Sequence, residues 1–394
     1  MKPHPPRPGP GLFGRPVLTI TIVLAILVSA GLGSVALANR NLFGGSPTWH
    51  TPTATDGSAR AVASASAAPA EPTTITLSAT GDIVMSSAPS RMPPRDGEGF
   101  FDAVRADLQS DLVMGNLEQP LTPDTGTSKC GPSPSDYCFA FRSPPSYARY
   151  LKDAGFDLMN TANNHTRDFG TAGARNTRAA LDDAGIRYTG DTGEITVVEV
   201  EGVRVAVVGF SSYAGANDLN DLDAARALMS QAGGRADLIV VQVHMGAEGA
   251  DRQHVGRGTE MFHGENRGDP MAFSRAVIDA GADLVIGHGP HVLRGMEFYR
   301  GRLIAYSLGN FAGGGRTLSR DGALRYAGIL HVTLTAAGEY AGGEFLSTYL
   351  DSAGLPARDG QNERGRALVE RLSAADFPDT GVLIDEDGSI TPRA

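Results

Sequence analysis

Cysteine is scarce in this sequence of 394 residues, which contains only Cys130 and Cys138. The two lie in a loop rich in glycine, proline and serine, and their spacing differs from the paired CxxC pattern of structural zinc sites. Nothing near them supplies further ligands, so a cysteine-based zinc centre is excluded. In an oxidising compartment the same pair predicts a local disulfide.

The sequence also lacks an excess of positive charge, since 34 Lys and Arg against 44 Asp and Glu give a formal net charge of −10. A nucleic-acid-binding protein usually carries a basic face, so this charge argues against nucleic acid as a partner. Charged residues make up 20% of the chain and hydrophobic residues 41%, which is typical of a globular protein. The length suggests two or three structural units.

Residues 17–38 contain no charged side chain and are long enough to cross a bilayer as a helix. They predict a transmembrane anchor with residues 1–16 in the cytoplasm, because basic residues precede the segment: Lys2, Arg7 and Arg15. The alternative is a signal peptide cleaved after residues 36–38, which would release a secreted protein. Both interpretations put the bulk of the chain outside the cytoplasm, the first as a single-pass protein of the cell membrane.

The remainder of the chain divides into three predicted parts. Residues 39–72 are rich in Ser, Thr, Ala and Pro and predict a disordered linker. Residues 73–350 are expected to form the folded domain. Residues 351–394 are polar and are expected to form a C-terminal extension with one helix over residues 363–374.

Five short apolar segments have the character of buried strands, and each ends in Asp, Asn, Glu or His: residues 76–82, 111–118, 156–165, 238–244 and 282–291. In open α/β sheets such strand ends meet at one edge, where ligands bind. Carboxylate, imidazole and amide groups suit a divalent metal ion, so the pattern predicts one shared metal site. Each such residue alone is more often a helix cap, a turn residue or a hydrogen-bonded structural histidine.

Local patterns predict a layered fold. The tripeptide Asp-Ala-Gly stands before a short apolar segment three times, which indicates a helix, a glycine stop and a strand. Hairpins are predicted over residues 195–208, 296–308 and 331–350, and a helical stretch over residues 100–109. Together these elements predict an α/β domain of two packed sheets covered by helices.

Six motifs in fixed order carry a family resemblance: TGDIVM at Thr80, GNLE at Gly115, ANNH at Ala162, HMGAE at His244, GHGPHV at Gly287 and YSLGNF at Tyr306. This set resembles the CapA family of poly-γ-glutamate capsule synthesis proteins over residues 74–311. That family is similar to calcineurin-like metallophosphoesterases. The resemblance implies a four-layer α-β-β-α sandwich of two mixed sheets.

The resemblance also implies roles for individual residues. His165 matches the catalytic histidine, and the matching metal ligands are Asp82, Asn116, Glu118, Asn164, His244, His288 and His291. They would hold one or two divalent ions, with Mn, Fe or Zn favoured over Ca. The pattern departs from that of the phosphoesterases in two places, because Val84 stands where a histidine is usual and Asn116 replaces the bridging aspartate, which leaves Glu118 as the bridging carboxylate. Met245 also stands where the CapA family usually has Trp.

Five further polar residues near the motifs are candidates for substrate binding: Arg142, Arg167, Glu248, Arg294 and Asn310. An arginine can hold an anionic group through two hydrogen bonds, although a surface salt bridge is the more common role for any one of them. For Glu248 and Asn310 the ordinary alternatives are a solvated loop carboxylate and a turn asparagine.

The function expected from the resemblance is that of a membrane-anchored, extracytoplasmic CapA-type protein. It would act as a metal-dependent hydrolase or transferase in the synthesis, attachment or trimming of an anionic envelope polymer such as poly-γ-glutamate. The alternative is a non-catalytic, metal-stabilised binding or scaffold subunit of a polymer synthase. Expected partners are the polymer or its precursors, membrane synthase subunits and, through the N-terminal helix, the membrane.

Overall fold

A computed structural model describes residues 73–133, 135 and 137–393 of the chain. The predicted cytoplasmic segment, anchor and linker at residues 1–16, 17–38 and 39–72 lie outside the described residues. Within the described ranges, no helix has the length and apolar character needed to span a membrane.

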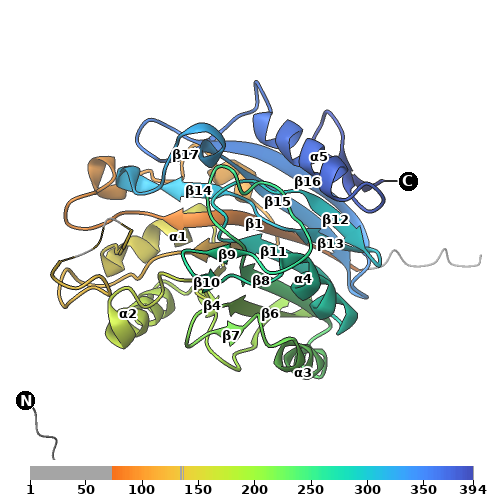
Figure 1. The fold of residues 1–394 in the computed structure, drawn as a ribbon, viewed down its shortest axis with the longest axis horizontal. Helices are drawn as coiled ribbons and strands as arrows, with labels where there is room; N and C mark the ends of the chain where they lie inside the picture. Colours follow the sequence, from red (N-terminus) through yellow and green to blue (C-terminus); the bar gives the residue numbers. More distant parts are fainter. Residues whose placement is uncertain (1–72, 134, 136, 394) are drawn as a thin grey trace, which may run out of the picture. The chain divides into compact units, whose positions relative to one another are not determined.

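The first of two large sheets combines parallel and antiparallel strands in the order β17-β16-β15-β1-β2-β3-β4, and β14 pairs with the end of β1 (Figure 1). Its parallel strands are β1 (Thr74–Val84), β2 (Leu112–Leu117), β3 (Leu158–Asn160), β4 (Arg187–Thr189) and β14 (Asn310–Gly313). The antiparallel strands are β15 (Tyr326–Thr335), β16 (Tyr340–Leu350) and β17 (Pro356–Arg358). The predicted hairpin over residues 331–350 is the β15–β16 pair.

The second sheet has the order β12-β13-β11-β8-β6-β5, and β7 (Asn217–Asp218) pairs with β6. Its members are β5 (Thr196–Val200), β6 (Val203–Ser211), β8 (Leu238–His244), β11 (Leu284–His288), β12 (Met296–Tyr299) and β13 (Arg302–Ala305). The other two predicted hairpins are the antiparallel pairs β5–β6 and β12–β13.

The main hydrophobic core lies between the two sheets. Strand β1 contributes Ile75 and Leu77, and the facing sheet contributes Val205, Val240 and Ile286, all of them almost fully buried. Removal of this apolar surface from water is the main force that holds the sheets together. The two-sheet α/β fold predicted from the sequence is confirmed.

Helices cover the outer face of each sheet. Apolar side chains of α1 (Ala148–Ala154) and α2 (Gly170–Asp183) share a core with the outer face of the first sheet. Those of α3 (Leu222–Gly233) and α4 (Pro270–Asp279) do the same on the second sheet. Each helix therefore buries one face and leaves the strand ends accessible.

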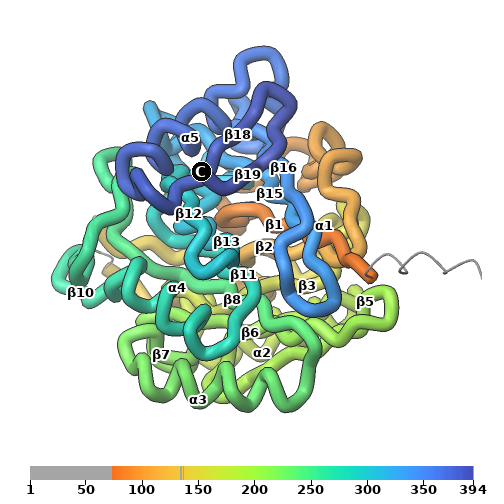
Figure 2. The backbone as a smooth tube through the Cα atoms, turned by 90° about the vertical axis from the view of Figure 1, so that its right-hand side faces the viewer, coloured from red at the N-terminus to blue at the C-terminus, as the bar shows by residue number. Residues whose placement is uncertain are grey.

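Residues 351–394 are part of the same fold. They form β17, α5 (Arg364–Asp376), β18 (Val382–Ile384) and β19 (Ile390–Pro392). Figure 2 shows α5 with β18 and β19 next to β12, β15 and β16. Apolar residues of α5 belong to the core between the sheets: Leu368, Val369 and Leu372. The predicted helix is present, but the predicted boundary at residue 350 does not divide the fold.

The stretch 100–109 differs from its expected helix. It holds turns and one 3-10 helix, Arg105–Leu108. Phe100 and Phe101 are adjacent in sequence, yet both rings are buried in the same core with centroids 4.7 Å apart. An α-helix directs adjacent side chains about 100° apart, so this packing favours turns instead.

The predicted disulfide joins Cys130 to Cys138. A small hairpin, β9 (Met261–Phe262) and β10 (Glu265–Asn266), lines the same cavity as the disulfide loop. The two segments approach one another at Tyr137 and His263, whose ring centroids lie 5.5 Å apart.

Replacement of Leu372 tests whether the C-terminal region is structurally required. We expect Leu372→Ala to lower the free energy of unfolding by about 2–5 kcal/mol, because it leaves a cavity in the core between the sheets. The exposed neighbour Arg371 is the control, and Arg371→Ala should change the free energy by less than about 0.5 kcal/mol. Urea denaturation measures both. Equal stability of the two variants would mean that α5 is dispensable.

Candidate metal and catalytic site

The ends of four central strands bring carboxylates and imidazoles together. Asp82 lies two residues before the end of β1, Glu118 follows β2, and His244 pairs with His288 in the register of β8 and β11. His291 follows on the next turn, with its Nδ1 3.1 Å from an Asp82 oxygen and its Nε2 3.7 Å from a Glu118 oxygen. Ligand atoms of Asp82, Glu118 and His291 all lie within 4.8 Å of one another. The convergence predicted from the strand pattern is therefore observed.

The backbone is shaped to permit this convergence. A Cβ on Gly81 would lie 1.9 Å from the Gly309 carbonyl oxygen. Only glycine therefore allows the strand before Asp82 to approach the backbone of Gly309 this closely. His291 has a φ of 61°, in the left-handed region that non-glycine residues rarely adopt. Such a conformation costs of order 1 kcal/mol or more and is typical of functional sites.

Several buried ligand-type atoms have no hydrogen-bond partner among the described residues: Glu118 Oε2, Asn164 Oδ1, His244 Nδ1 and His288 Nδ1. Nearly all buried polar atoms in proteins have a partner, so a group of such atoms needs an explanation. The Nε2 of His288 lies 3.1 Å from Gln242 Oε1, an oxygen that can only accept. Nε2 therefore carries the proton, and Nδ1 presents a lone pair. These atoms fit a divalent metal ion with nitrogen and oxygen ligands.

The charge balance of the cluster also fits a cation. Burial lowers the pKa of His244 to about 3 and of His288 to about 4, so both imidazoles are neutral at pH 7. Burial also lowers the pKa of His291, but Glu118, Asp82 and Glu248 outweigh it and raise the value to about 10. His291 is thus the positive charge that offsets the surrounding carboxylates when no other cation is bound.

The pKa values of the two buried carboxyl groups of the cluster are shifted in opposite directions. Burial raises the pKa of Glu118 to about 8, against the opposing charge of His291. Burial also raises the pKa of Asp82, but the hydrogen bond and charge of His291, with the neighbouring histidines, lower it to about 2. A divalent ion would hold both groups in the carboxylate form, which is the form that binds metal.

Asn116 orients Asp82 rather than offering a ligand atom of its own. Its Nδ2 donates to Asp82 Oδ1 at 2.8 Å, while its Oδ1 accepts from Asn160 at 3.0 Å and from Asn163 at 3.1 Å. Both lone pairs of that oxygen are therefore in use. This geometry does not support the metal-ligand role predicted for Asn116. Asn160 was missed from the sequence because a lone strand asparagine carries no distinctive signal.

His165 lies beside the cluster with a partner that sequence reasoning missed. Its Nδ1 is 2.8 Å from Oδ2 of Asp168, a fully buried carboxylate. Lys129 Nζ is 2.8 Å from the other oxygen of the same carboxylate. The spacing of three residues between His165 and Asp168 is a signal that could have been used, whereas Lys129 is distant in sequence. Because Asp168 engages Nδ1, the ring nitrogen left for chemistry is Nε2.

Asp168 also holds both ends of the disulfide loop. The Lys129 N–H donates to the Asp168 carbonyl at 2.6 Å, and the Phe141 N–H donates to Asp168 Oδ2 at 2.6 Å. The ring of Phe141 packs against that of His165 with centroids 4.6 Å apart. The loop and the imidazole therefore depend on one carboxylate.

Glu248 joins the cluster from the loop after β8. One of its oxygens is 3.7 Å from His291 Nε2, and the other accepts a hydrogen bond from Asn164 Nδ2 at 3.5 Å. Burial raises the pKa of Glu248, but His291 and the ion pair with the buried Arg267 lower it overall. Arg267 was not predicted. It fixes Glu248 at the edge of the site.

The other predicted substrate contacts fall into two groups. Arg294 is 1% exposed and bound to Glu260 through two hydrogen bonds of 2.9 and 2.8 Å, and Arg142 forms an ion pair with Asp124. The guanidinium groups of both are occupied, so their geometry favours a structural role. Arg167 is exposed and Asn310 lines a cavity of about 410 Å³ next to His165.

Beside the cluster lies a cavity of about 710 Å³, and His291 itself lines the neighbouring cavity of about 410 Å³. The walls of the larger cavity include His165 and Glu248 on the inner side and aromatic side chains from the two bordering loops: Tyr137, Phe139, Phe262 and His263. A volume of this size suits a ligand rather than a few waters.

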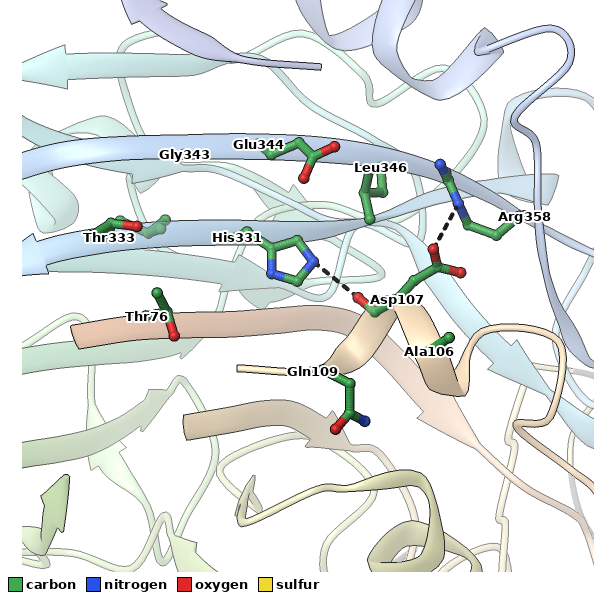
Figure 3. A pocket seen from close by; sticks show the side chains of 11 residues that line it. Thr76, Ala106, Asp107, Gln109, His331, Thr333, Gly343, Glu344, Leu346 and Arg358 are labelled. Atoms are coloured by element: carbon green, nitrogen blue, oxygen red, sulfur yellow. Dashed lines mark hydrogen bonds and ion pairs between the residues drawn. The ribbon is translucent and has the colours of Figure 1, made fainter. Parts of the chain in front are cut away.

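A separate groove of about 570 Å³ lies on the far part of the first sheet and is shown in Figure 3. Its histidine, His331, has both ring nitrogens engaged, by Ser78 Oγ at 2.8 Å and the Asp107 carbonyl at 2.9 Å. Arg358 Nε lies 3.4 Å from Asp107 Oδ1. Because these polar groups are already paired with one another, we interpret the groove as a gap left where β15 and β16 pack against the 3-10 helix Arg105–Leu108.

Comparison with known proteins gives a consistent set of relatives. The family model described as bacterial capsule synthesis protein PGA_cap matches residues 76–314. The capsule biosynthesis protein CapA of Bacillus anthracis is 32% identical over 275 residues, which cover 64% of this chain and 62% of that protein. The PGA biosynthesis protein CapA of Bacillus subtilis (strain 168) is 31% identical over 270 residues, covering 64% and 66%. The match thus spans somewhat less than two thirds of the length of each relative.

Among solved structures, the 5'-nucleotidase precursor from Thermus thermophilus aligns with 77% of this chain and 59% of its own chain. The TM-score is 0.39 and the sequence identity 14%.

The charge balance predicts a pH-dependent metal affinity. A proton on His291 competes with the cation, because the pKa of that imidazole is about 10 without metal. Raising the pH from 6 to 7 should therefore strengthen Mn²⁺ binding by at least about tenfold, because His291 and also Glu118, whose pKa is about 8, release protons when the ion binds. Calorimetric titration in buffers of different ionisation enthalpy measures the affinity and the proton release. His291→Ala should bind more weakly and with a shallower pH slope, and a wild-type affinity independent of pH would contradict this charge balance.

Proposed function

This chain belongs to the PGA_cap family of bacterial capsule synthesis proteins, as its ordered motifs indicated, and from that membership we propose that it is a metal-dependent enzyme acting on poly-γ-glutamate or a related anionic envelope polymer. The names of its relatives, a capsule biosynthesis protein and a PGA biosynthesis protein, support this substrate class. The reaction class we propose is hydrolysis or group transfer, at a site of the metallophosphoesterase type.

One observation carries the proposal of an enzyme. The His165–Asp168 pair stands beside the cluster of Asp82, Glu118 and His291, and His165 and His291 both line the cavity of about 410 Å³. A protein that only binds a polymer has no need of an imidazole whose tautomer is fixed by a buried carboxylate. That arrangement is typical of general acid–base catalysis.

The ligand set proposed for the metal follows from the lone pairs in the cluster. It consists of Asp82, Glu118, Asn164, His244, His288 and His291. A bound divalent cation supplies Lewis acidity, which favours attack on a phosphoryl or carbonyl centre. Gln242 and Asn116 would act on the ligands, by fixing the tautomer of His288 and the orientation of Asp82.

His165 supplies the proton-transfer step in this proposal. Asp168 keeps Nδ1 protonated and stabilises positive charge on the ring, so Nε2 can give a proton to the leaving group or hold developing negative charge. Lys129 offsets the charge of Asp168 on the opposite side. The Asp168 carboxylate and the Lys129 ammonium together therefore carry no net charge beside the His165 imidazole.

We also propose that the protein acts outside the cytoplasm, anchored by residues 17–38 or released after their cleavage. The disulfide between Cys130 and Cys138 supports an oxidising compartment. A synthase complex in the membrane is the corresponding proposed partner.

The second candidate function is a non-catalytic, metal-stabilised subunit that binds polymer. The altered first metal site favours it, because Val84 and Asn116 replace groups that phosphoesterases use as ligands. The two functions differ in what they require of His165.

Metal content and turnover measured on the same variants separate the two functions. His244→Ala and His288→Ala should lose bound metal, because each removes a ligand for which the described cluster has no substitute. His165→Ala should keep its metal and lower turnover of γ-glutamyl peptides or phosphoesters by roughly 10²–10⁴-fold. Mass spectrometry of the native protein measures the metal, and His254→Ala, at an exposed histidine away from the cluster, is the control.

Two results would count against the enzyme. Unchanged turnover in His165→Ala, with metal and polymer affinity intact, would support the binding subunit. Full metal occupancy in both His244→Ala and His288→Ala would remove the shared metal site altogether.

A further inference from the structure

We propose that Arg167 forms an anion subsite beside the catalytic cavity, which binds the free carboxylate of a second residue of the polymer. This inference rests on the proposed function, because it assumes that one unit of an anionic polymer lies at His165. With this subsite the protein would bind a polymer chain more tightly than a single acidic unit.

The guanidinium of Arg167 is held in place without a charge partner. It lies against the backbone of Gly215, where an added Cβ would be 2.3 Å from Nη2 and 2.6 Å from Cζ. In the described part of the chain, no carboxylate lies within ion-pair distance of Arg167, and its side chain donates no hydrogen bond. Although Arg167 is exposed, its guanidinium packs against the Gly215 backbone, which limits the orientations open to it. Pre-positioning lowers the entropic cost of binding a ligand.

The position of Arg167 continues the catalytic cavity. It lines a smaller cavity of about 220 Å³ that shares Lys129, Asn164 and Tyr213 with the larger one. The two cavities are therefore neighbours, and the proposal places one unit of the chain at His165 and the next at Arg167.

The other charged groups of the small cavity are already paired. Lys129 is bound to Asp168 at 2.8 Å, and Asp191 is bound to Arg178 at 2.6 Å. Arg167 is therefore the uncompensated charge of this cavity and makes it electropositive within an acidic protein. A planar guanidinium binds carboxylate through two parallel hydrogen bonds.

The ligand that fits is a γ-linked glutamate chain, because every unit of that chain carries a free α-carboxylate. A phosphate-bearing ligand would present a similar oxyanion, and the experiment distinguishes the two. Binding alone is measured, so the result does not depend on turnover.

The test measures the affinity of the metal-loaded protein for fluorescent γ-glutamate oligomers of one to six units. We expect affinity to rise from one unit to two or three. Arg167→Ala should abolish that gain, a loss of roughly fivefold to tenfold, and leave the affinity for a single unit unchanged. Gly215→Ala keeps the charge but displaces the guanidinium, and it should show the same loss if its thermal unfolding remains like that of the wild type. Arg175→Ala, an exposed arginine on α2 without an ion pair among the described residues, is the matched control.

A second arm identifies the group that Arg167 contacts. Oligomers whose α-carboxylates are converted to amides should bind wild type and Arg167→Ala alike, giving a non-additive cycle with the native oligomers. Equal affinities of wild type and Arg167→Ala for every oligomer would overturn the subsite and leave the proposed enzyme standing, because the catalytic variants test that separately. An effect of Arg167→Ala confined to phosphorylated ligands, or an equal effect of Arg175→Ala, would also overturn it.

Discussion

Burial of several carboxylates in one place is the constraint on which the rest of this structure depends. Asp82 and Glu118 are fully buried, and Glu248 stands at the edge of the same cluster. Like charges at this distance repel strongly where water is excluded, so the carboxylates require positive charge nearby or a proton, as the raised pKa of Glu118 shows. His291 supplies one charge from a strained backbone position. A divalent cation would neutralise the carboxylates more completely, and the protonated form of His291 would then no longer be needed.

The two sheets serve this cluster by bringing strand ends from distant parts of the chain to one edge. Central strands buried on both faces carry mostly apolar side chains, and the carboxylates and imidazoles gather near the strand ends. This is why the sequence pattern predicted that Asp82, Glu118 and the three histidines lie close together. A polar residue directly after an apolar segment is easily recognised in the sequence. Parallel pairing then brings these strand ends together, independently of the conformation of the loops.

The residues that prediction missed act through contacts between distant segments. Lys129 and Arg267 come from loops, and nothing in their local sequence indicates that they meet Asp168 and Glu248. The role of Asn116 was hard to assign because a ligand and a hydrogen-bonding neighbour of a ligand look alike in sequence. The region after residue 350 looked like an appendage because its composition is polar, although a few apolar side chains on one helix face suffice to seal the core.

The carboxylate of Asp168 has a consequence beyond the orientation of one imidazole. Because it binds both ends of the disulfide loop, any ligand that shifts the loop also perturbs the hydrogen bond to His165. In the proposed function, recognition at the aromatic wall and proton transfer by His165 would then be thermodynamically linked, and linkage of this kind is reciprocal. A polymer that contacts the loop would stabilise the hydrogen bond between Asp168 and His165 and so orient the imidazole for proton transfer. A short acid that does not contact the loop would leave the imidazole less well oriented. Discrimination would then appear in the rate of the reaction as well as in the strength of binding.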